Sequence, residues 1–136
     1  MELLEDPQTR GFERAAVASG VEKRIAYLDV SDQKLLQVTL SGTLSRREAG
    51  MLVGLSSGTV TRRIRRLINR LHDPLVAALV ENGKLLPDLH QEVGLAYFLR
   101  KRPIRRIGVE YGLTLCEVKR ILAYIRGWHA ASKRRC

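Results

Sequence analysis

Residues 45–64, SRREAGMLVGLSSGTVTRRI, decide the fold of this chain, and residues 103–122, PIRRIGVEYGLTLCEVKRIL, repeat their pattern. Equivalent residues stand 58 positions apart: Gly50 and Gly108, Gly54 and Gly112, Leu55 and Leu113, and Val60 and Val118. The spacing is typical of a helix, a tight turn and a second helix with one apolar face. The sequence therefore predicts two copies of one helix-turn-helix unit, an arrangement that reads duplex DNA.

The glycines account for the shape expected of each unit. Gly50 and Gly108 are expected where two helices press together and leave no room for a side chain. Gly54 and Gly112 each follow a helix, where glycine adopts positive φ without a steric cost. Capping residues are expected to begin the second helix of each unit: Ser56 in the first, and Thr114 with Glu117 in the second.

Helical spacing of apolar residues continues through the rest of the chain, and no pattern indicates a β-hairpin, so we predict an all-α protein. Tandem tri-helical helix-turn-helix units are expected, joined by a short helical connector. The predicted segments are an N-terminal arm and helix over 1–28, a first unit over 29–73, a connector over 74–85, a second unit over 86–129 and a basic tail over 130–136. An amphipathic helix is expected over 12–28, and Asp32 is expected to cap the first helix of the first unit.

The charge of the chain favours a polyanionic partner. Its 136 residues include 24 Lys and Arg against 14 Asp and Glu, a net charge of +10, which attracts nucleic acid. An acidic membrane is the competing polyanion, but the longest apolar run, near 75–80, is far too short to span one. The acidic Glu2, Glu5 and Asp6 do not suit a secretory signal peptide. We therefore expect a cytoplasmic protein with no membrane partner.

Residues suited to catalysis are few. His72, His90 and His129 lie far apart and lack metal-ligand partners at helical spacing, and Cys116 and Cys136 form neither a disulfide framework nor a metal motif. No phosphate-binding loop or nucleophile motif is present. The sequence predicts a binding protein rather than an enzyme, with no cofactor and no metal.

The second helix of the first unit is the predicted base-reading element, because the N-terminal residues of such a helix meet base edges in the major groove. Arg62 and Arg65 are expected to read guanine, while Ser57 and Thr61 suit phosphate or thymine methyl contacts. Gly58 would let the backbone approach DNA closely. The arginines expected to contact flanking phosphates are Arg46, Arg47, Arg63 and Arg66.

The second unit is expected to contribute phosphate contacts rather than base reading. Leu115 and Cys116 stand where its recognition helix would enter the groove, and both are poor partners for base edges. A dense basic cluster precedes the helix, and two more cations face outward from it: Arg100, Lys101, Arg102, Arg105 and Arg106, then Lys119 and Arg120. A solvated surface charge is the alternative role for each of these side chains.

The motif Leu44-Ser45-x-Arg47-Glu48, followed by Gly54-Leu55-Ser56-x-Gly58-Thr59-Val60-x-x-Arg63-Ile64, resembles the fourth conserved region of bacterial RNA polymerase sigma factors. In that family the second helix of this region recognises an upstream promoter element. The resemblance covers 32–71, and the segment 86–128 resembles the region more distantly. It implies duplex DNA as partner, with RNA polymerase or another transcription protein as a second candidate, and a place at a bacterial or phage nucleoid.

Departures from the family limit what the resemblance implies. A complete sigma factor also needs a DNA-melting region with exposed aromatic residues, and residues 1–30 offer only Phe12 and Tyr27. The resemblance thus implies a duplicated DNA-reading module acting in transcriptional regulation. Two alternatives stay open: an adaptor that binds RNA polymerase or another transcription factor, and a structural or packaging protein that reads DNA shape and charge. The sequence does not fix the oligomeric state.

Overall fold

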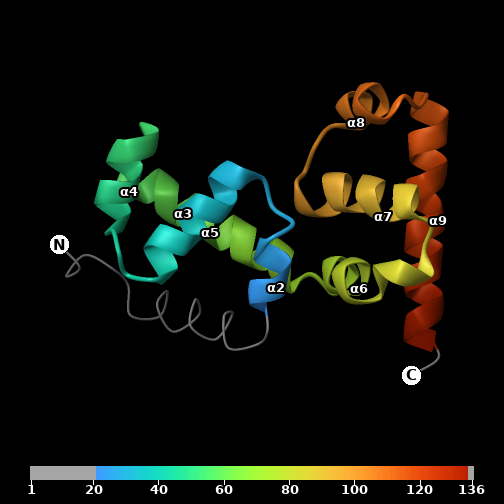
Figure 1. Cartoon of the computed structure of the whole chain (residues 1–136), viewed down its shortest axis with the longest axis horizontal. Helices are drawn as coiled ribbons and strands as arrows, with labels where there is room; N and C mark the ends of the chain where they lie inside the picture. Colours follow the sequence, from blue (N-terminus) through green and yellow to red (C-terminus); the bar gives the residue numbers. More distant parts are fainter. Residues whose placement is uncertain (1–20, 135–136) are drawn as a thin grey trace. The chain divides into compact units, whose positions relative to one another are not determined.

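The computed structural model describes residues 21–134, and every regular element in that range is a helix (Figure 1). The predicted all-α class is therefore confirmed. The chain divides into two compact units, the first ending at His72 and the second beginning at Asp73. Most of the helix predicted over 12–28 lies outside the described residues, as do residues 135–136 of the basic tail.

The first unit contains four described helices. They are α2 (Glu22–Ile25), α3 (Val30–Leu40), α4 (Arg46–Val53) and α5 (Ser57–His72). α4 packs against α5, and α3 contacts both. Apolar side chains recur along one face of α5 at helical spacing and are buried among these helices. The buried residues of α5 are Val60, Ile64, Leu67, Ile68 and Leu71, which meet Leu35 and Leu36 of α3 in the core.

The second unit contains six described elements, α6 (Pro74–Asn82), the 3-10 turn η3 (Gly83–Leu85), α7 (Asp88–Gly94), the π-helical turn η4 (Leu95–Leu99), α8 (Ile104–Tyr111) and α9 (Leu115–Arg134). α9 packs against α7 and α8. The predicted connector 74–85 forms α6 and η3, and α6 packs on η4 and α9. Val76 and Leu79 of α6 are fully buried. The segment is thus part of the second hydrophobic core rather than a linker, because its apolar face needs a partner.

The helices of the two units begin at matching positions. α3 and α7, α4 and α8, and α5 and α9 start 58 residues apart in each case. The units differ outside this shared set, since α6 and η3 belong to the second unit alone among the described residues. The sequence repeat therefore corresponds to a repeat of helices, with the same order and the same spacing.

A left-handed glycine ends α4 and another ends α8. Gly54 has φ 74° and Gly112 has φ 66°, and their amides donate to the carbonyls of Gly50 and Gly108. The Leu55 amide also donates to the Gly50 carbonyl, at 2.8 Å. Each helix thus stops within one residue, and the chain turns at once into the next helix.

Side-chain caps set the helix starts. Ser45 and Glu48 form a reciprocal capping box on α4, and Thr114 and Glu117 form the predicted box before α9, with N···O distances of 3.1 and 3.2 Å. Ser56 accepts from the Thr59 amide at 3.2 Å, as its place before α5 predicts. These bonds satisfy amides that have no partner inside the helix.

The close helix contact expected at Gly50 and Gly108 yields a stability test. A Cβ at Gly50 would overlap the backbone carbonyl of Leu55, and a Cβ at Gly108 would lie 2.8 Å from the Leu113 carbonyl oxygen. We expect alanine at either position to lower the free energy of unfolding by about 1–3 kcal/mol, because backbone must shift to admit it. The effect should be larger at Gly50, where the overlap is greater. Thermal and urea unfolding of the two variants measure it.

Gly127 of α9 is the matched control, because a Cβ there would meet no atom within 4 Å. Alanine at Gly127 should raise the free energy of unfolding by up to about 1 kcal/mol through helix propensity alone. Unfolding curves for Gly50→Ala and Gly108→Ala that match the parent would contradict the proposed tight contacts.

Candidate nucleic-acid interface

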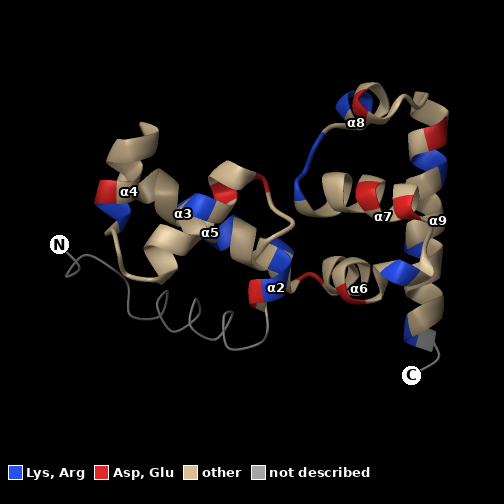
Figure 2. Cartoon of the chain, in the orientation of Figure 1, with Lys and Arg blue, Asp and Glu red and all other residues tan. Residues whose placement is uncertain are grey.

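The helix α5 presents a basic side opposite its buried apolar side. Arg62, Arg63, Arg65 and Arg66 are all exposed, and Figure 2 shows Lys and Arg residues along this helix. Their spacing follows from the apolar positions between them, since Ile64 and Leu67 point into the core. Arg62, Arg65 and Arg66 therefore lie on the exposed side of α5, which is the side that the sequence predicts to face outward.

The N-terminal end of α5 is polar and uncrowded. Ser57 and Gly58 are exposed, and a Cβ on Gly58 would meet only the Arg62 Nη1, at 3.8 Å. Thr61 is half-buried, and its hydroxyl donates to the Ser57 carbonyl at 3.0 Å. That bond leaves the oxygen lone pairs and the methyl group of Thr61 for an outside partner.

Arg62 lies along the start of α5. Its Nη2 donates to the Thr59 Oγ1 at 3.1 Å, and no described carboxylate pairs with it. A guanidinium held by one neutral hydroxyl keeps several donors for an anion or a base edge. The position agrees with the predicted base-reading role.

Arg63 has a structural partner that the sequence did not reveal. Its Nε and Nη2 lie 2.9 and 2.7 Å from the Asp32 Oδ1, so the pair joins α3 to α5. Asp32 is 8% exposed and lies inside α3. The expected capping role of Asp32 is wrong, because Asp29 occupies the N-cap position of α3. The phosphate contact expected of Arg63 would compete with this ion pair.

Arg46 is a second correction among the flanking arginines. It is only 7% exposed, although it was expected on the surface beside Arg47. Arg46 begins α4, and Ala49 and Gly50, three and four positions later on the same face, are buried too. Its side chain therefore runs with the buried face of α4, whereas Arg47 is exposed and remains suited to a phosphate.

Arg70, toward the C-terminal end of α5, lies near two other arginines of the same helix, Arg63 and Arg66. Burial lowers the pKa of Arg70 most strongly, the nearby Asp32 raises it, and Arg63 and Arg66 lower it again. Arginine remains protonated at neutral pH despite such shifts, because its pKa lies so high. An anion bound beside Arg63 and Arg66 would offset the repulsion that these two arginines exert on Arg70.

The basic cluster before α8 is partly neutralised within the second unit. Arg102 Nη1 lies 2.9 and 3.1 Å from the two carboxylate oxygens of Glu110, and the Arg102 side chain is only 16% exposed. Lys101 precedes it with φ 58°, a left-handed conformation that is uncommon for lysine. Arg105 and Arg106 of α8 are exposed. The predicted phosphate role therefore suits these two better than Arg102.

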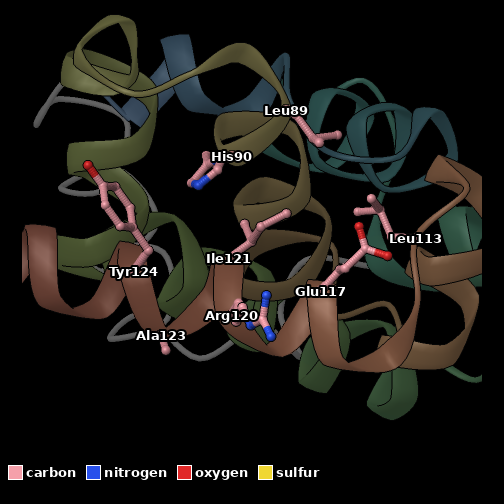
Figure 3. A pocket seen from close by; sticks show the side chains of 8 residues that line it. All are labelled: Leu89, His90, Leu113, Glu117, Arg120, Ile121, Ala123 and Tyr124. Carbon is pink, nitrogen blue, oxygen red and sulfur yellow. The ribbon is translucent and has the colours of Figure 1, made fainter.

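The start of α9 differs from the start of α5, as the sequence indicated. Leu115 is 44% exposed, and Cys116, Lys119 and Arg120 are exposed as well. Farther along, α9 and α7 border an open groove with a volume of about 680 Å³ (Figure 3). The groove is lined by five apolar residues, Leu89, Leu113, Ile121, Ala123 and Tyr124, and by three polar ones, His90, Glu117 and Arg120.

No protein-family model, curated protein or solved structure matches this chain. Among residues 21–134, no helix is long and apolar enough to cross a membrane. Within the same described part of the chain, no three His, Cys, Asp or Glu side chains come together as metal ligands.

The sequence analysis did not predict two features of this surface. Asp32 and Arg63 are 31 positions apart, and only the packing of α3 on α5 brings them together. The α7–α9 groove likewise depends on side chains from two helices. The repeat gives only a weak hint of it, because Ala123 and Tyr124 occupy the positions of Arg65 and Arg66 in the first unit.

The Asp32–Arg63 pair gives a second stability test. Arg63→Ala should lower the free energy of unfolding by about 1–3 kcal/mol, since it leaves the poorly exposed Asp32 carboxylate without its partner. Arg66→Ala, which removes an exposed arginine from the same helix, is the control and should change the free energy by less than about 0.5 kcal/mol. Chemical denaturation measures both, and equal effects would show that the ion pair does not stabilise the unit.

Proposed function

We propose that this chain is a sequence-specific duplex DNA-binding protein that regulates transcription, with α5 reading the major groove. The observation that carries the proposal is the exposed face of α5, on which Arg62, Arg65 and Arg66 follow the open, polar residues Ser57 and Gly58. Helices of this kind place their N-terminal residues on base edges and their flanks on phosphates. The resemblance to sigma-factor region four supports the same role.

The geometry supports unequal roles for the two units. The first offers Ser57, Gly58 and Thr61 at the start of its recognition helix, whereas the second offers the apolar Leu115 there. Base edges present hydrogen-bonding groups, which an apolar side chain leaves unsatisfied. The second unit would therefore add phosphate contacts through Arg105 and Arg106. A protein with this role would act in the cytoplasm, at a bacterial or phage chromosome, by binding rather than by catalysis.

DNA binding should depend steeply on salt. We expect micromolar or tighter affinity for double-stranded DNA that falls by about 10²–10⁵ between about 50 and 200 mM salt, because several phosphates are neutralised and their counterions released. Fluorescence anisotropy with a labelled duplex measures this. A duplex obtained by selection from random sequence, compared with its scrambled version, gives the specificity ratio.

Three outcomes separate the alternatives. A steep salt dependence with discrimination between the duplexes supports sequence-specific binding. A steep salt dependence without discrimination supports a structural or packaging protein. No binding at low salt contradicts any DNA-binding role and supports the protein adaptor.

Arg62 and Arg105 should have different roles at the interface. Arg62→Ala should cost about 1–3 kcal/mol at the selected site and relax base preference, because a base contact is lost. Arg105→Ala should weaken binding to selected and scrambled duplexes alike and lower the salt slope by roughly one, because a phosphate contact is lost. Titrations of both variants against both duplexes measure these effects.

Lys84→Ala is the control for net charge, because it removes one exposed cation of η3, outside α5, α8 and α9. It should change neither affinity by more than about twofold, given how little a distant, screened charge contributes. The assignment is reversed if Arg105→Ala abolishes discrimination while Arg62→Ala preserves it.

A further inference from the structure

Two apolar residues of α4 project from the first unit into solvent. Met51 and Leu52 are each 75% exposed, on the side of α4 away from the buried Ala49 and Gly50. Glu48 precedes them by three and four positions on the same helix face, and one of its carboxylate oxygens accepts from the Ser45 amide at 3.3 Å. Exposed apolar side chains that adjoin one another can form an interaction surface. We call Met51 and Leu52 the α4 knob.

The second unit carries an open apolar surface of its own, the α7–α9 groove. Leu89 is 38% exposed and Tyr124 is 56% exposed on its two sides, and Ile121 forms part of its floor (Figure 3). Arg120 is exposed at the same groove, and it makes no hydrogen bond or ion pair with any described residue. The groove thus combines an apolar bed with a cation that has no anionic partner within residues 21–134.

The repeat shows how this groove departs from the first unit. The positions of Ile121, Ala123 and Tyr124 are occupied there by Arg63, Arg65 and Arg66. At these three positions α9 carries uncharged residues where α5 carries arginines. An apolar surface cannot neutralise phosphate, so this side of α9 is unsuited to DNA and suited to a protein.

We propose that the α7–α9 groove binds the α4 knob of a second copy of this chain. Met51 and Leu52 would enter the apolar bed, and Glu48 Oε2, which the capping box does not use, would face Arg120. Helices commonly bind to grooves through anchors spaced three and four residues apart. The knob and the groove are different surfaces, so the contact is heterologous, and it builds either a ring or an open chain of copies.

The net charge of the chain determines how this contact responds to salt. Two copies at +10 repel each other, and salt screens that repulsion. The contact itself is mainly apolar, and salt does not weaken apolar burial. Self-association should therefore strengthen as salt rises, the opposite of DNA binding. The proposal does not depend on DNA binding, because it concerns the free protein.

Sedimentation velocity of the full chain tests the proposal at high micromolar concentration and about 0.5 M salt, where the charges are strongly screened. The knob variant is Met51→Gln with Leu52→Gln, and the groove variant is Leu89→Gln with Ala123→Gln. All four changes preserve net charge. Tyr124 is left in place because its ring contacts His90 edge-on, with centroids 5.1 Å apart. Val109→Gln is the control, since Val109 is an 82% exposed apolar residue of α8 outside both surfaces.

The parent chain and Val109→Gln should self-associate equally, and each double variant should weaken association at least about tenfold. A mixture of the two double variants should form a one-to-one complex that grows no further, because each supplies the surface that the other lacks. Helix content and melting temperature, followed by circular dichroism, confirm that the variants fold.

Several results would overturn the proposal. One is a parent chain that stays monomeric at every salt concentration. Another is association that survives either double variant. A third is a mixture of the two double variants that fails to associate while the parent does. Loss of association in Val109→Gln as well would show that general hydrophobicity, rather than the knob and groove, drives the assembly.

Discussion

The contact between Gly50 and the turn after α4 determines the geometry of the first unit. The Leu55 amide donates to the Gly50 carbonyl at 2.8 Å, while the Leu55 carbonyl lies so close to the Gly50 α-carbon that no side chain fits between them. A Cβ would also lie 3.2 Å from the Val60 methyl group of α5. The direction in which α5 leaves the turn, and hence the face that Arg62 occupies, depends on this approach. Gly108 and Leu113 repeat it in the second unit.

The two units have the same order and spacing of helices but different surfaces. Packing constrains the residue type at the buried positions and leaves the exposed positions free to differ. Val60 and Val118 are both fully buried, so their equivalence is required by the core. The Asp32–Arg63 ion pair of the first unit corresponds to His90 and Ile121 in the second. An ion pair that joins two helices in one unit is thus replaced by an open apolar groove in the other. The fully buried valines keep the same packing in both units, while the exposed side chains beside them differ.

The sequence predicted the helices and turns well because local chemistry determines them. The positive φ of Gly54 and Gly112 and the Thr114–Glu117 capping box are set by residues close in the chain. Contacts between distant residues were missed. Arg46 was expected on the surface because arginine usually is, but its register on α4 places it with the buried face. Arg102 was expected to meet phosphate, yet Glu110 binds it. The spacing of apolar residues predicts which face of a helix a residue occupies. It does not identify the side chain that contacts that residue.

Charge connects the two proposed interactions. The free chain carries +10. At low salt the repulsion between two copies would therefore outweigh the proposed apolar contact. Binding to DNA would neutralise part of that charge through phosphates and release counterions. It would also hold neighbouring copies at an effective concentration far above that in solution, so that a weak contact between them would form. An apolar knob and groove that associate poorly in free solution would then act between copies on one duplex. Under this scheme the same positive charge that favours DNA binding also confines self-association to the DNA-bound state at low salt.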